Sequence, residues 1–266
     1  MNDRVRIHVD EHGVADVCMV RGDKMNALDA AMFDALAAAI VQLKADARVR
    51  VVVLRGEGRS FCAGLDTSRF DKMSSGADGG IRDLRSRSHG IANSAQFIAW
   101  GWRELQVPVI AAVQGAALGG GLQVALGADI RLVTPDVKMS VLEIKWGLVP
   151  DVAGIALLRS LVRDDVAREL TFTGRIVGGE EAVRLGLATR VCADPQAEAL
   201  ALAREMAGRN PHALRAGKRL LNLAVDGTEA QVLQAESDEQ VALMGTPNQT
   251  EAVRANLEKR APKFHD

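Results

Sequence analysis

Apolar and polar residues alternate in the first part of the chain. The alternation runs over residues 5–9, and a turn signal at His12 and Gly13 separates it from a second apolar stretch, residues 14–20. A period of two is typical of a strand with one buried face, and two such runs joined by a short turn indicate a hairpin. The chain is therefore expected to begin with paired strands.

A helix and a buried strand are predicted next. Asn26 is a residue type that caps helices, and residues 27 to about 44 show helical spacing of apolar positions. Residues 49–54 form a mainly β-branched run that a glycine soon ends, which is typical of a buried strand. The predicted order is strand, strand, helix, strand.

A similar order returns in the middle of the chain without a detectable sequence repeat. Residues 107–113 are predicted to form a buried strand, residues 120–127 a short helix and residues 130–134 another strand. Between the two stretches, residues 74–80 are turn formers with nothing to bury, so we expect a flexible excursion that could lie over a binding site.

Strand signals stop at about Asp194, and helical spacing with Pro or Gly breaks follows. Helices are expected over residues 196–209, 211–225, 228–244 and 249–260. We therefore divide the chain into a core of residues 1–194 and a C-terminal helical region of residues 195–266.

The composition provides a large core but no strong electrostatic field. Of 266 residues, 48% are apolar, which is more than enough for a substantial core, and the formal net charge is −1. So small a charge does not concentrate nucleic acid or anionic lipid around a protein. The one uncharged run of membrane-spanning length, residues 105–128, contains five glycines and a proline. We expect neither nucleic acid nor membrane as a partner.

The cysteines indicate the compartment. Cys18, Cys62 and Cys192 are odd in number, far apart and without C-x-x-C spacing, so neither a disulfide framework nor a zinc site is expected. Charged residues interrupt the first twenty positions, which excludes the apolar core of a secretory signal. A reducing cytoplasm fits both observations.

Three consecutive glycines at residues 119–121 suggest a special backbone. The segment lacks the Lys and Ser or Thr of a phosphate loop and does not fit the dinucleotide pattern G-x-G-x-x-G. One interpretation is close packing of a helix start against a strand. The other is that Gly120 offers a free N–H to an oxygen that gains negative charge. Gly64 can leave the N–H of Leu65 pointing outward in the same way, and two such donors would form an oxyanion hole.

Four segments in order resemble the motifs of the crotonase superfamily, the family of enoyl-CoA hydratases and isomerases. They are KMNAL at residues 24–28, SFCAGLD at 60–66, QGAALGGG at 114–121 and VLEIKWGLVPD at 141–151. The resemblance spans nearly the whole chain. It implies an α/β fold, a crotonase-type spiral of repeated ββα units with a helical C-terminal region, and a homo-oligomer, either a trimer or a dimer of trimers. In such proteins the core carries the acyl-CoA site, and the helical region forms the trimer and covers the site.

The resemblance also implies a binding site for an acyl-CoA thioester. Leu65 and Gly120 would hold the thioester oxygen; CoA is part of the substrate, so no separate cofactor and no metal are implied. The substrate-binding residues would be Lys24, Met25, Ala27, Ala63, Gly64, Asp66, Gly119 and Trp146. Lys24, Arg59, Arg69 and Lys72 could meet the phosphates of CoA, although single surface charges are usually only solvated. For Trp146, a place in the core is the alternative.

In hydratases of this family two glutamates hold and deprotonate water, and the matching positions here are Gln123 and Glu143. An amide can hydrogen-bond water through its oxygen but cannot exchange a proton at neutral pH. Hydration should therefore be slower by roughly 10²- to 10⁴-fold. Glu143 has apolar neighbours that can raise its pKa. Alone, it can still carry a proton between two carbons, which favours isomerisation or a related proton transfer.

Alternatives remain at several positions. Asp151 matches a catalytic aspartate of family members that shift conjugated dienes, but an Asp after a proline and before an apolar run is also a natural helix cap. Cys62 is expected to be a buried thiol rather than a nucleophile, and His89 an exposed loop residue that could touch substrate. At the level of the whole protein, a thioester hydrolase and a catalytically weak acyl-CoA binder remain open.

Overall fold

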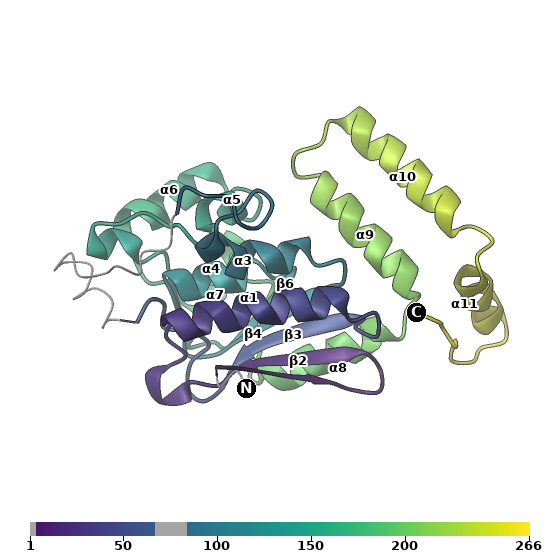
Figure 1. The fold of residues 1–266 in the computed structure, drawn as a ribbon, viewed down its shortest axis with the longest axis horizontal. Coiled ribbons are helices and arrows are strands. Elements are labelled where there is room, and N and C mark those ends of the chain that lie inside the picture. The colour runs from purple at the N-terminus through teal and green to yellow at the C-terminus, as the bar shows by residue number, and fades with distance from the viewer. Residues whose placement is uncertain (1–3, 67–83) are drawn as a thin grey trace.

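The computed structural model describes residues 4–66 and 84–266 (Figure 1). The predicted excursion at residues 74–80, together with Arg69 and Lys72, lies outside the described residues. A large sheet holds strands β1 (Val5–Val9), β2 (Val14–Met19), β3 (Val51–Gly56), β4 (Val109–Val113), β6 (Ile130–Val133) and β8 (Arg190–Val191), in that spatial order. The β1–β2 pair is antiparallel, which confirms the predicted hairpin, and the other neighbours are parallel.

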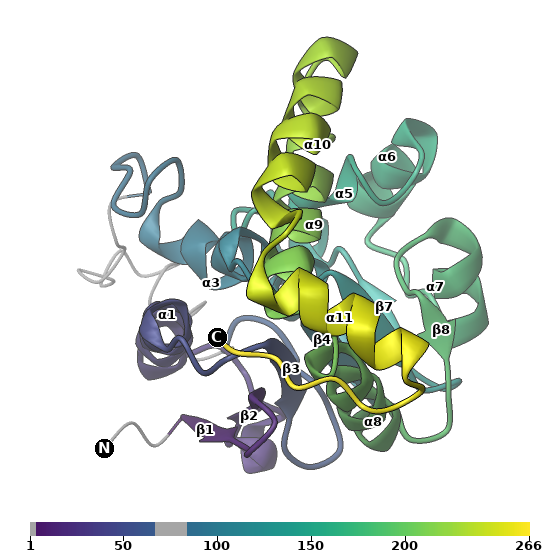
Figure 2. The ribbon, with the colours of Figure 1, turned by 90° about the vertical axis from the view of Figure 1, so that its right-hand side faces the viewer.

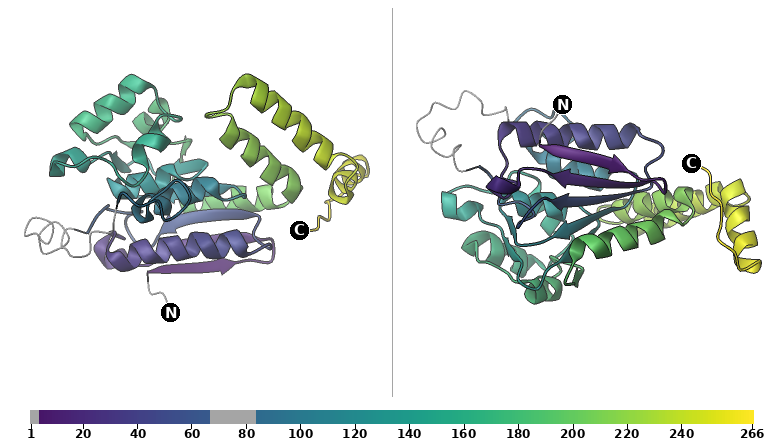
Figure 3. Two further views of the ribbon diagram at one scale, coloured as in Figure 1. Left: turned by 45° about the horizontal axis from the view of Figure 1, so that its top comes forward. Right: turned by 90° about the horizontal axis from the view of Figure 1, so that it is seen from below.

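Alternate residues of the large sheet pack against two different layers. In β3, Val52 and Leu54 face a core that includes α1 (Ala30–Ala45) and α3 (Ser94–Glu104). Val51 and Val53 face the opposite side, where α8 (Pro195–Ala207) covers the sheet (Figure 3). A strand buried on both faces needs apolar residues at every position, because successive side chains point to opposite sides.

A second, small sheet runs beside the first. It pairs β5 (Ala116–Leu118) in parallel with β7 (Lys138–Ser140). Two isolated parallel bridges extend it: Leu28 pairs with Leu65, and Cys62 pairs with Ala117. Each part of the core therefore passes from a strand of the large sheet to a short extended piece in the small sheet and then to a helix. This is the repeated ββα spiral that the motifs implied, and it places the loops between strand and helix side by side.

The first helix begins later than predicted. Its N-cap is Asp29, whose side chain accepts a hydrogen bond from Met32 N, so the prediction of Asn26 as the cap was wrong. Asn26 instead has a left-handed backbone with φ 55° and a fully buried side chain. Its Nδ2 donates to the carbonyl oxygens of Glu57 and Ser60, which fastens the loop after β3.

The helical C-terminal stretch agrees with the predicted spacing. After α8 it contains α9 (Pro211–Leu223), α10 (Glu229–Leu243) and α11 (Pro247–Leu257). α9 and α10 stand out from the core as an antiparallel pair (Figure 1), and the tail after α11 returns towards β3 (Figure 2). The buried Lys218 of α9 holds this region to the core, because its Nζ donates to the carbonyls of Trp102 and Val107 and pairs with Asp129 at 2.8 Å.

The other helices of the described residues are short. They are η1 (Gly22–Lys24), α4 (Gly120–Leu126), η2 (Glu143–Trp146), α5 (Gly154–Leu158), α6 (Asp164–Thr173) and α7 (Gly179–Leu185). None of the helices within the described residues combines the length and apolar content that crossing a bilayer requires. The division into a core of residues 1–194 and a helical region of residues 195–266 stays a prediction.

Candidate active site

Two glycine-containing segments, residues 60–66 and 114–121, meet at the start of α4. Cys62 N donates to Ala116 O at 2.9 Å, and Leu118 N donates to Cys62 O at 3.1 Å. The segments are so close that a Cβ on Gly64 would lie 2.5 Å from Leu118 O and 3.7 Å from Gly120 N. Gly64 therefore lies directly against the first residue of the helix.

Backbone amides of both segments are available at this junction. Leu28 N donates to Gly64 O, and Asp66 N donates to Leu28 O, at 2.8 and 3.2 Å. Because successive amides of an extended segment point to opposite sides, the N–H of Leu65 points away from Leu28. Gly120 is the first residue of α4, so its amide has no acceptor inside the helix.

Each of the three consecutive glycines has its own steric reason. Gly119 has φ 50° and ψ −122°, a conformation that side chains rarely allow. A Cβ on Gly120 would lie 2.9 Å from a methyl group of Leu28, and one on Gly121 only 2.3 Å from Cys62 O. Steric constraints therefore account for all three glycines, and the other interpretation, a free N–H at Gly120, is compatible with them.

Gln123 projects from α4 and is oriented by two backbone donors. Its Oε1 accepts hydrogen bonds from Val152 N and Gly154 N, both at 2.8 Å. The amide nitrogen must therefore face the other way, where Nε2 donates to Glu143 Oε1 at 2.6 Å. The amide oxygen, through which such a side chain can hydrogen-bond water, already accepts two hydrogen bonds here.

Glu143 begins η2 and has two unequal carboxylate oxygens. Oε1 accepts from Gln123, whereas Oε2 is buried and has no hydrogen-bond partner among the described residues. Burial raises the pKa of this carboxyl, while hydrogen bonds from backbone amides and from Gln123 act in the opposite direction. The predicted rise in pKa is confirmed in direction. The apolar neighbours in sequence explain this rise only in part. Ile144, which directly follows, is 45% exposed, so it does not enclose the carboxyl.

Asp151 is held by side-chain amides rather than by a helix start. Its carboxylate accepts from Gln96 Nε2 at 2.7 Å and from Asn93 Nδ2 at 3.5 Å. The helix-cap interpretation is wrong: the N-cap of α5 is Ala153, which has φ 64° and no capping side chain. Sequence reasoning missed Asn93 and Gln96. Their N-x-x-Q spacing signals a helix start, which is correct for α3, but not a contact with a residue more than fifty positions away.

The KMNAL segment lies along the Gly64 segment. Ala63 N donates to Met25 O at 2.9 Å, and Met25 has a left-handed backbone with φ 50°. Ala27 is buried and Lys24 is exposed at the edge of the segment. Asp66 accepts from Arg21 Nη1 at 2.6 Å, so its carboxylate is already paired with a cation.

Other candidates take simpler positions. Trp146 is 46% exposed, so the core alternative for it is wrong. Cys62 is fully buried, and burial raises its pKa to about 12, which makes it an inert thiol. His89 stacks on Phe97 of α3 with ring centroids 4.1 Å apart. The described residues contain no group of three or more His, Cys, Asp or Glu side chains that could hold a metal ion.

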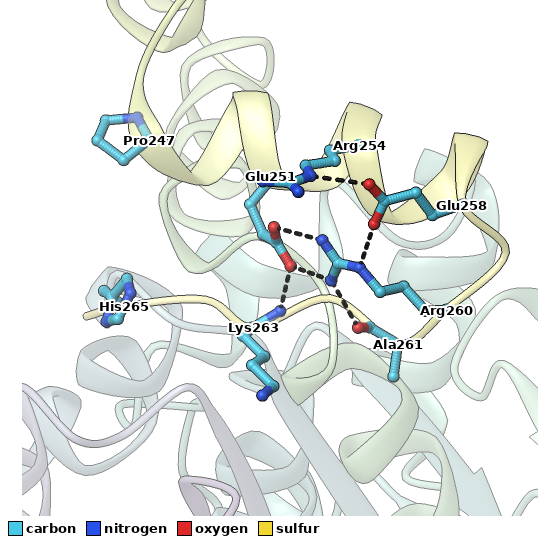
Figure 4. Close-up of a pocket in the computed structure, with 8 residues that line it drawn as sticks. All are labelled: Pro247, Glu251, Arg254, Glu258, Arg260, Ala261, Lys263 and His265. Carbon is cyan, nitrogen blue, oxygen red and sulfur yellow. Dashed lines mark hydrogen bonds and ion pairs between the residues drawn. The ribbon is translucent and has the colours of Figure 1, made fainter.

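An open pocket of about 440 Å³ lies far from these residues, between α11 and the tail (Figure 4). Glu251 and Glu258 both pair with Arg260 at 2.6 Å, and Glu251 also accepts from Lys263 N. These contacts hold the tail against α11, and none of the candidate site residues lines this pocket.

Comparisons with known proteins agree on one family. The family model for enoyl-CoA hydratase/isomerase matches residues 10–266. The chain is 33% identical to the mitochondrial methylglutaconyl-CoA hydratase of Mus musculus, over 98% of this chain and 83% of that protein. It is 35% identical to the mitochondrial enoyl-CoA hydratase domain-containing protein 2 of Homo sapiens, over 96% and 86% of the two chains. The crystal structure of an enoyl-CoA hydratase from Polaromonas sp. JS666 matches with a TM-score of 0.87 at 27% identity, covering 98% of this chain and 99% of that one.

Proposed function

The chain belongs to the enoyl-CoA hydratase/isomerase family, and we propose that it moves a proton along the acyl chain of an acyl-CoA thioester, with double-bond isomerisation as its main reaction. The observation that carries this proposal is the orientation of Gln123. Two backbone N–H groups bind its oxygen, so only its NH₂ group faces Glu143. The site therefore offers one buried glutamate instead of two.

The first requirement of such a reaction is a stabilised enolate. A thioester releases a proton from its α-carbon only when the developing negative charge on the oxygen is accommodated. We assign this task to the backbone amides of Leu65 and Gly120, because their segments adjoin and each amide is turned away from its own secondary structure. One preorganised donor of this kind is typically worth about 2.7–4 kcal/mol.

Glu143 Oε2 is then the atom that carries the proton. In a 3-enoyl-CoA, the C2–H bond breaks, the proton passes to Oε2, and the electron pair spreads into the thioester as a dienolate. The same proton then forms the new C–H bond at C4, the double bond settles between C2 and C3, and Glu143 is ionised again. The step needs no activated water, and a buried carboxyl with a raised pKa suits both halves of it.

Water addition is disfavoured by the same geometry. A water beside Gln123 would meet an N–H donor, which occupies a lone pair of the water instead of removing its proton. Of the pair Gln123 and Glu143, only Glu143 can act as a base towards that water. The relatives are named hydratases, so hydration is the rival reaction that the experiment must exclude.

The substrate is proposed to lie along the two glycine-containing segments. Met25, Ala27, Ala63 and Gly64 form adjoining backbone beside the junction, and exposed Lys24 stands at its edge, where a phosphate of CoA can approach. On the acyl side we assign Gly119, next to Glu143, and the half-exposed Trp146.

The proposal is tested with pure protein and a panel of 2-enoyl-, 3-enoyl- and 2,4-dienoyl-CoA esters, with the products separated. We expect 3-enoyl-CoA to convert to 2-enoyl-CoA, and Glu143→Gln to lower the rate at least a hundredfold, the usual worth of a general base. Release of free CoA would identify a thioester hydrolase. Tight binding without turnover, unchanged by Glu143→Gln, would identify an acyl-CoA binder; either outcome contradicts the proposal.

We also propose that the chain works as a homo-oligomer, a trimer or a dimer of trimers, in a reducing cytoplasm. Large apolar side chains on α9–α11 are exposed: Leu221 73%, Leu233 62%, Val241 72% and Leu257 79%. Faces of this kind on a folded protein mark association sites. All three cysteines are free and buried, as a reducing compartment allows.

A further inference from the structure

Two glutamines of the site use their amide groups in the same way. Gln96 Oε1 accepts hydrogen bonds from Asn93 N at 3.0 Å and from Arg87 Nη1 at 2.8 Å. Its Nε2 must therefore point to the other side, where it donates to Asp151 at 2.7 Å. Gln123 repeats this pattern: donors hold its oxygen, and its nitrogen donates to Glu143. In both cases the donors around the oxygen fix which end of the amide faces a carboxylate.

The two glutamines hold opposite ends of one turn, residues 151–154. Gln96 holds Asp151 at its beginning, and Gln123 accepts from Val152 N and Gly154 N. Between them Ala153 has a left-handed backbone with φ 64°. This conformation costs a non-glycine residue of order 1 kcal/mol or more, so it persists only where the surroundings hold it. The contacts from α3 and α4 do so here.

The same turn orients the catalytic carboxylate. Gln123 presents its NH₂ to Glu143 only while Val152 N and Gly154 N occupy its oxygen. A shift of the turn would release that oxygen and allow the amide to rotate. The position of Asp151 is therefore connected to Glu143 through two backbone amides and one side chain.

We propose that Gln96 is a positioning residue, which fixes Asp151 and the 151–154 turn and thereby holds Gln123 and Glu143 in the arrangement that proton transfer needs. This inference rests on the proposed function, because it assigns Gln96 a role in the Glu143 reaction. It does not require Asp151 itself to touch the substrate.

One substitution separates this role from the structural role of Gln96. Gln96 also forms a capping box with Asn93 at the start of α3. In Gln96→Glu, a carboxylate oxygen can still accept from Asn93 N and pair with Arg87, and Glu is a common capping-box residue. Only the donor towards Asp151 is lost, and two carboxylates then face each other where the donor and acceptor are 2.7 Å apart.

The experiment measures kcat and KM for conversion of 3-enoyl-CoA in the wild type, Gln96→Glu, Asp151→Asn and the double variant. We expect Gln96→Glu to lower kcat ten- to a hundredfold, since misplacement of a site by about 1 Å can cost 10²-fold. KM should change less than about threefold. With Asp151→Asn the new amide can donate to the carboxylate introduced at position 96, so adding Gln96→Glu should change kcat by less than about twofold.

A matched control is available on α10, where Gln234 Nε2 donates to Asp238 at 2.8 Å. Gln234→Glu makes the same chemical change away from the 151–154 turn and its contacts, and it should leave kcat unchanged. An equal loss from Gln96→Glu with and without Asp151→Asn would overturn the inference, as would no loss at all. Glu143→Gln is measured in parallel. If it retains activity, the proposed function has failed, whereas an inactive Glu143→Gln with a fully active Gln96→Glu rejects the role of Gln96 alone.

Discussion

Burial and hydrogen bonding act in opposite directions on the Glu143 carboxyl. Burial raises its pKa, whereas the N–H donors, including that of Gln123, lower it. A base for carbon acids must be ionised when substrate arrives, yet it works best when its pKa is not far below the working pH. The glutamine therefore moderates the effect of burial and also holds one of the two carboxylate oxygens.

The pH dependence of the reaction should reflect this balance. In the proposed reaction the ionised carboxylate is the base, so kcat/KM should rise with pH through the pKa of Glu143, above the ordinary range of a glutamate. In Gln123→Leu the N–H donor is lost, and the rise should move to higher pH. A rate series across the acid range with 3-enoyl-CoA measures both positions. A shift to lower pH would contradict the assigned direction.

Restoring a second carboxylate should change the reaction. In Gln123→Glu the new side chain can accept from Val152 N and Gly154 N, while its other oxygen faces Glu143. The pair then resembles that of the hydratases, and water addition to a short 2-enoyl-CoA should increase roughly 10²-fold or more. The assay follows loss of the conjugated thioester. Unchanged hydration in a variant whose Glu143 remains essential would show that Gln123 does not limit water addition.

At the level of elements, helix starts are constrained by what lies against them. α4 begins against Cys62 and Leu28, and its glycines leave room for that approach. α9 contains Gly217, where a Cβ would meet nothing within 4 Å. The two helices therefore offer the same residue type in opposite surroundings.

Because of this contrast, we expect Gly→Ala substitutions in the two helices to change the free energy of unfolding in opposite directions. Gly121→Ala should destabilise the protein by about 1–3 kcal/mol, because the new Cβ would lie 2.3 Å from Cys62 O. Gly217→Ala should stabilise it by about 0.5–1 kcal/mol, since alanine is the better helix former and nothing obstructs it. Denaturant unfolding of both variants measures the changes. A stabilised Gly121→Ala would disprove the close approach.

The sequence predicted the elements better than their starts. Alternation in residues 5–9, followed by a turn signal and an apolar run at 14–20, indicated the hairpin, because burial of one or both faces leaves a direct trace in the residue order. The start of α1 was misplaced because Asn26 and Asp29 are both capping residue types. The contacts of Asn26 with the loop after β3 hold it outside the helix, and those contacts are tertiary.

The motifs proposed residues for the candidate site but not the contacts between them. Motif order identified Gln123 and Glu143, yet the orientation of the amide depends on Val152 and Gly154, which lie 29 and 31 residues away from Gln123. Gln96 was missed for the same reason, since no local pattern relates it to Asp151. Hydrogen bonds between distant segments carry this information.

On the scale of the whole molecule, the helical region is attached firmly at its base and exposed at its far end. Lys218 is 6% exposed and satisfied by three oxygens of the core, whereas none of the residues of α10 is buried. An element without a fully buried residue in its own chain gains little from folding alone. A second copy of the chain is the proposed cover for it.

Charges placed on that face should therefore weaken association. Leu233→Glu together with Val241→Glu should shift sedimentation of the protein from an oligomer towards the monomer mass, because an uncompensated charge is costly to bury. Val41→Glu is the matched control, since Val41 is 55% exposed but lies on α1. A wild type that sediments as a monomer at micromolar concentration would contradict the proposal.

In the ββα spiral, the strands of the two sheets form the framework, and the segments between strands and helices form the candidate site. One turn of the spiral brings residues 57–65 to the candidate site, the next brings 114–121, and a third brings 141–154. The first two contain the proposed holders of the thioester oxygen, and the third contains the carboxylates. If the proposed roles hold, changes in the last segment and in α4 would alter the reaction, while the segments proposed to hold the thioester oxygen stay the same.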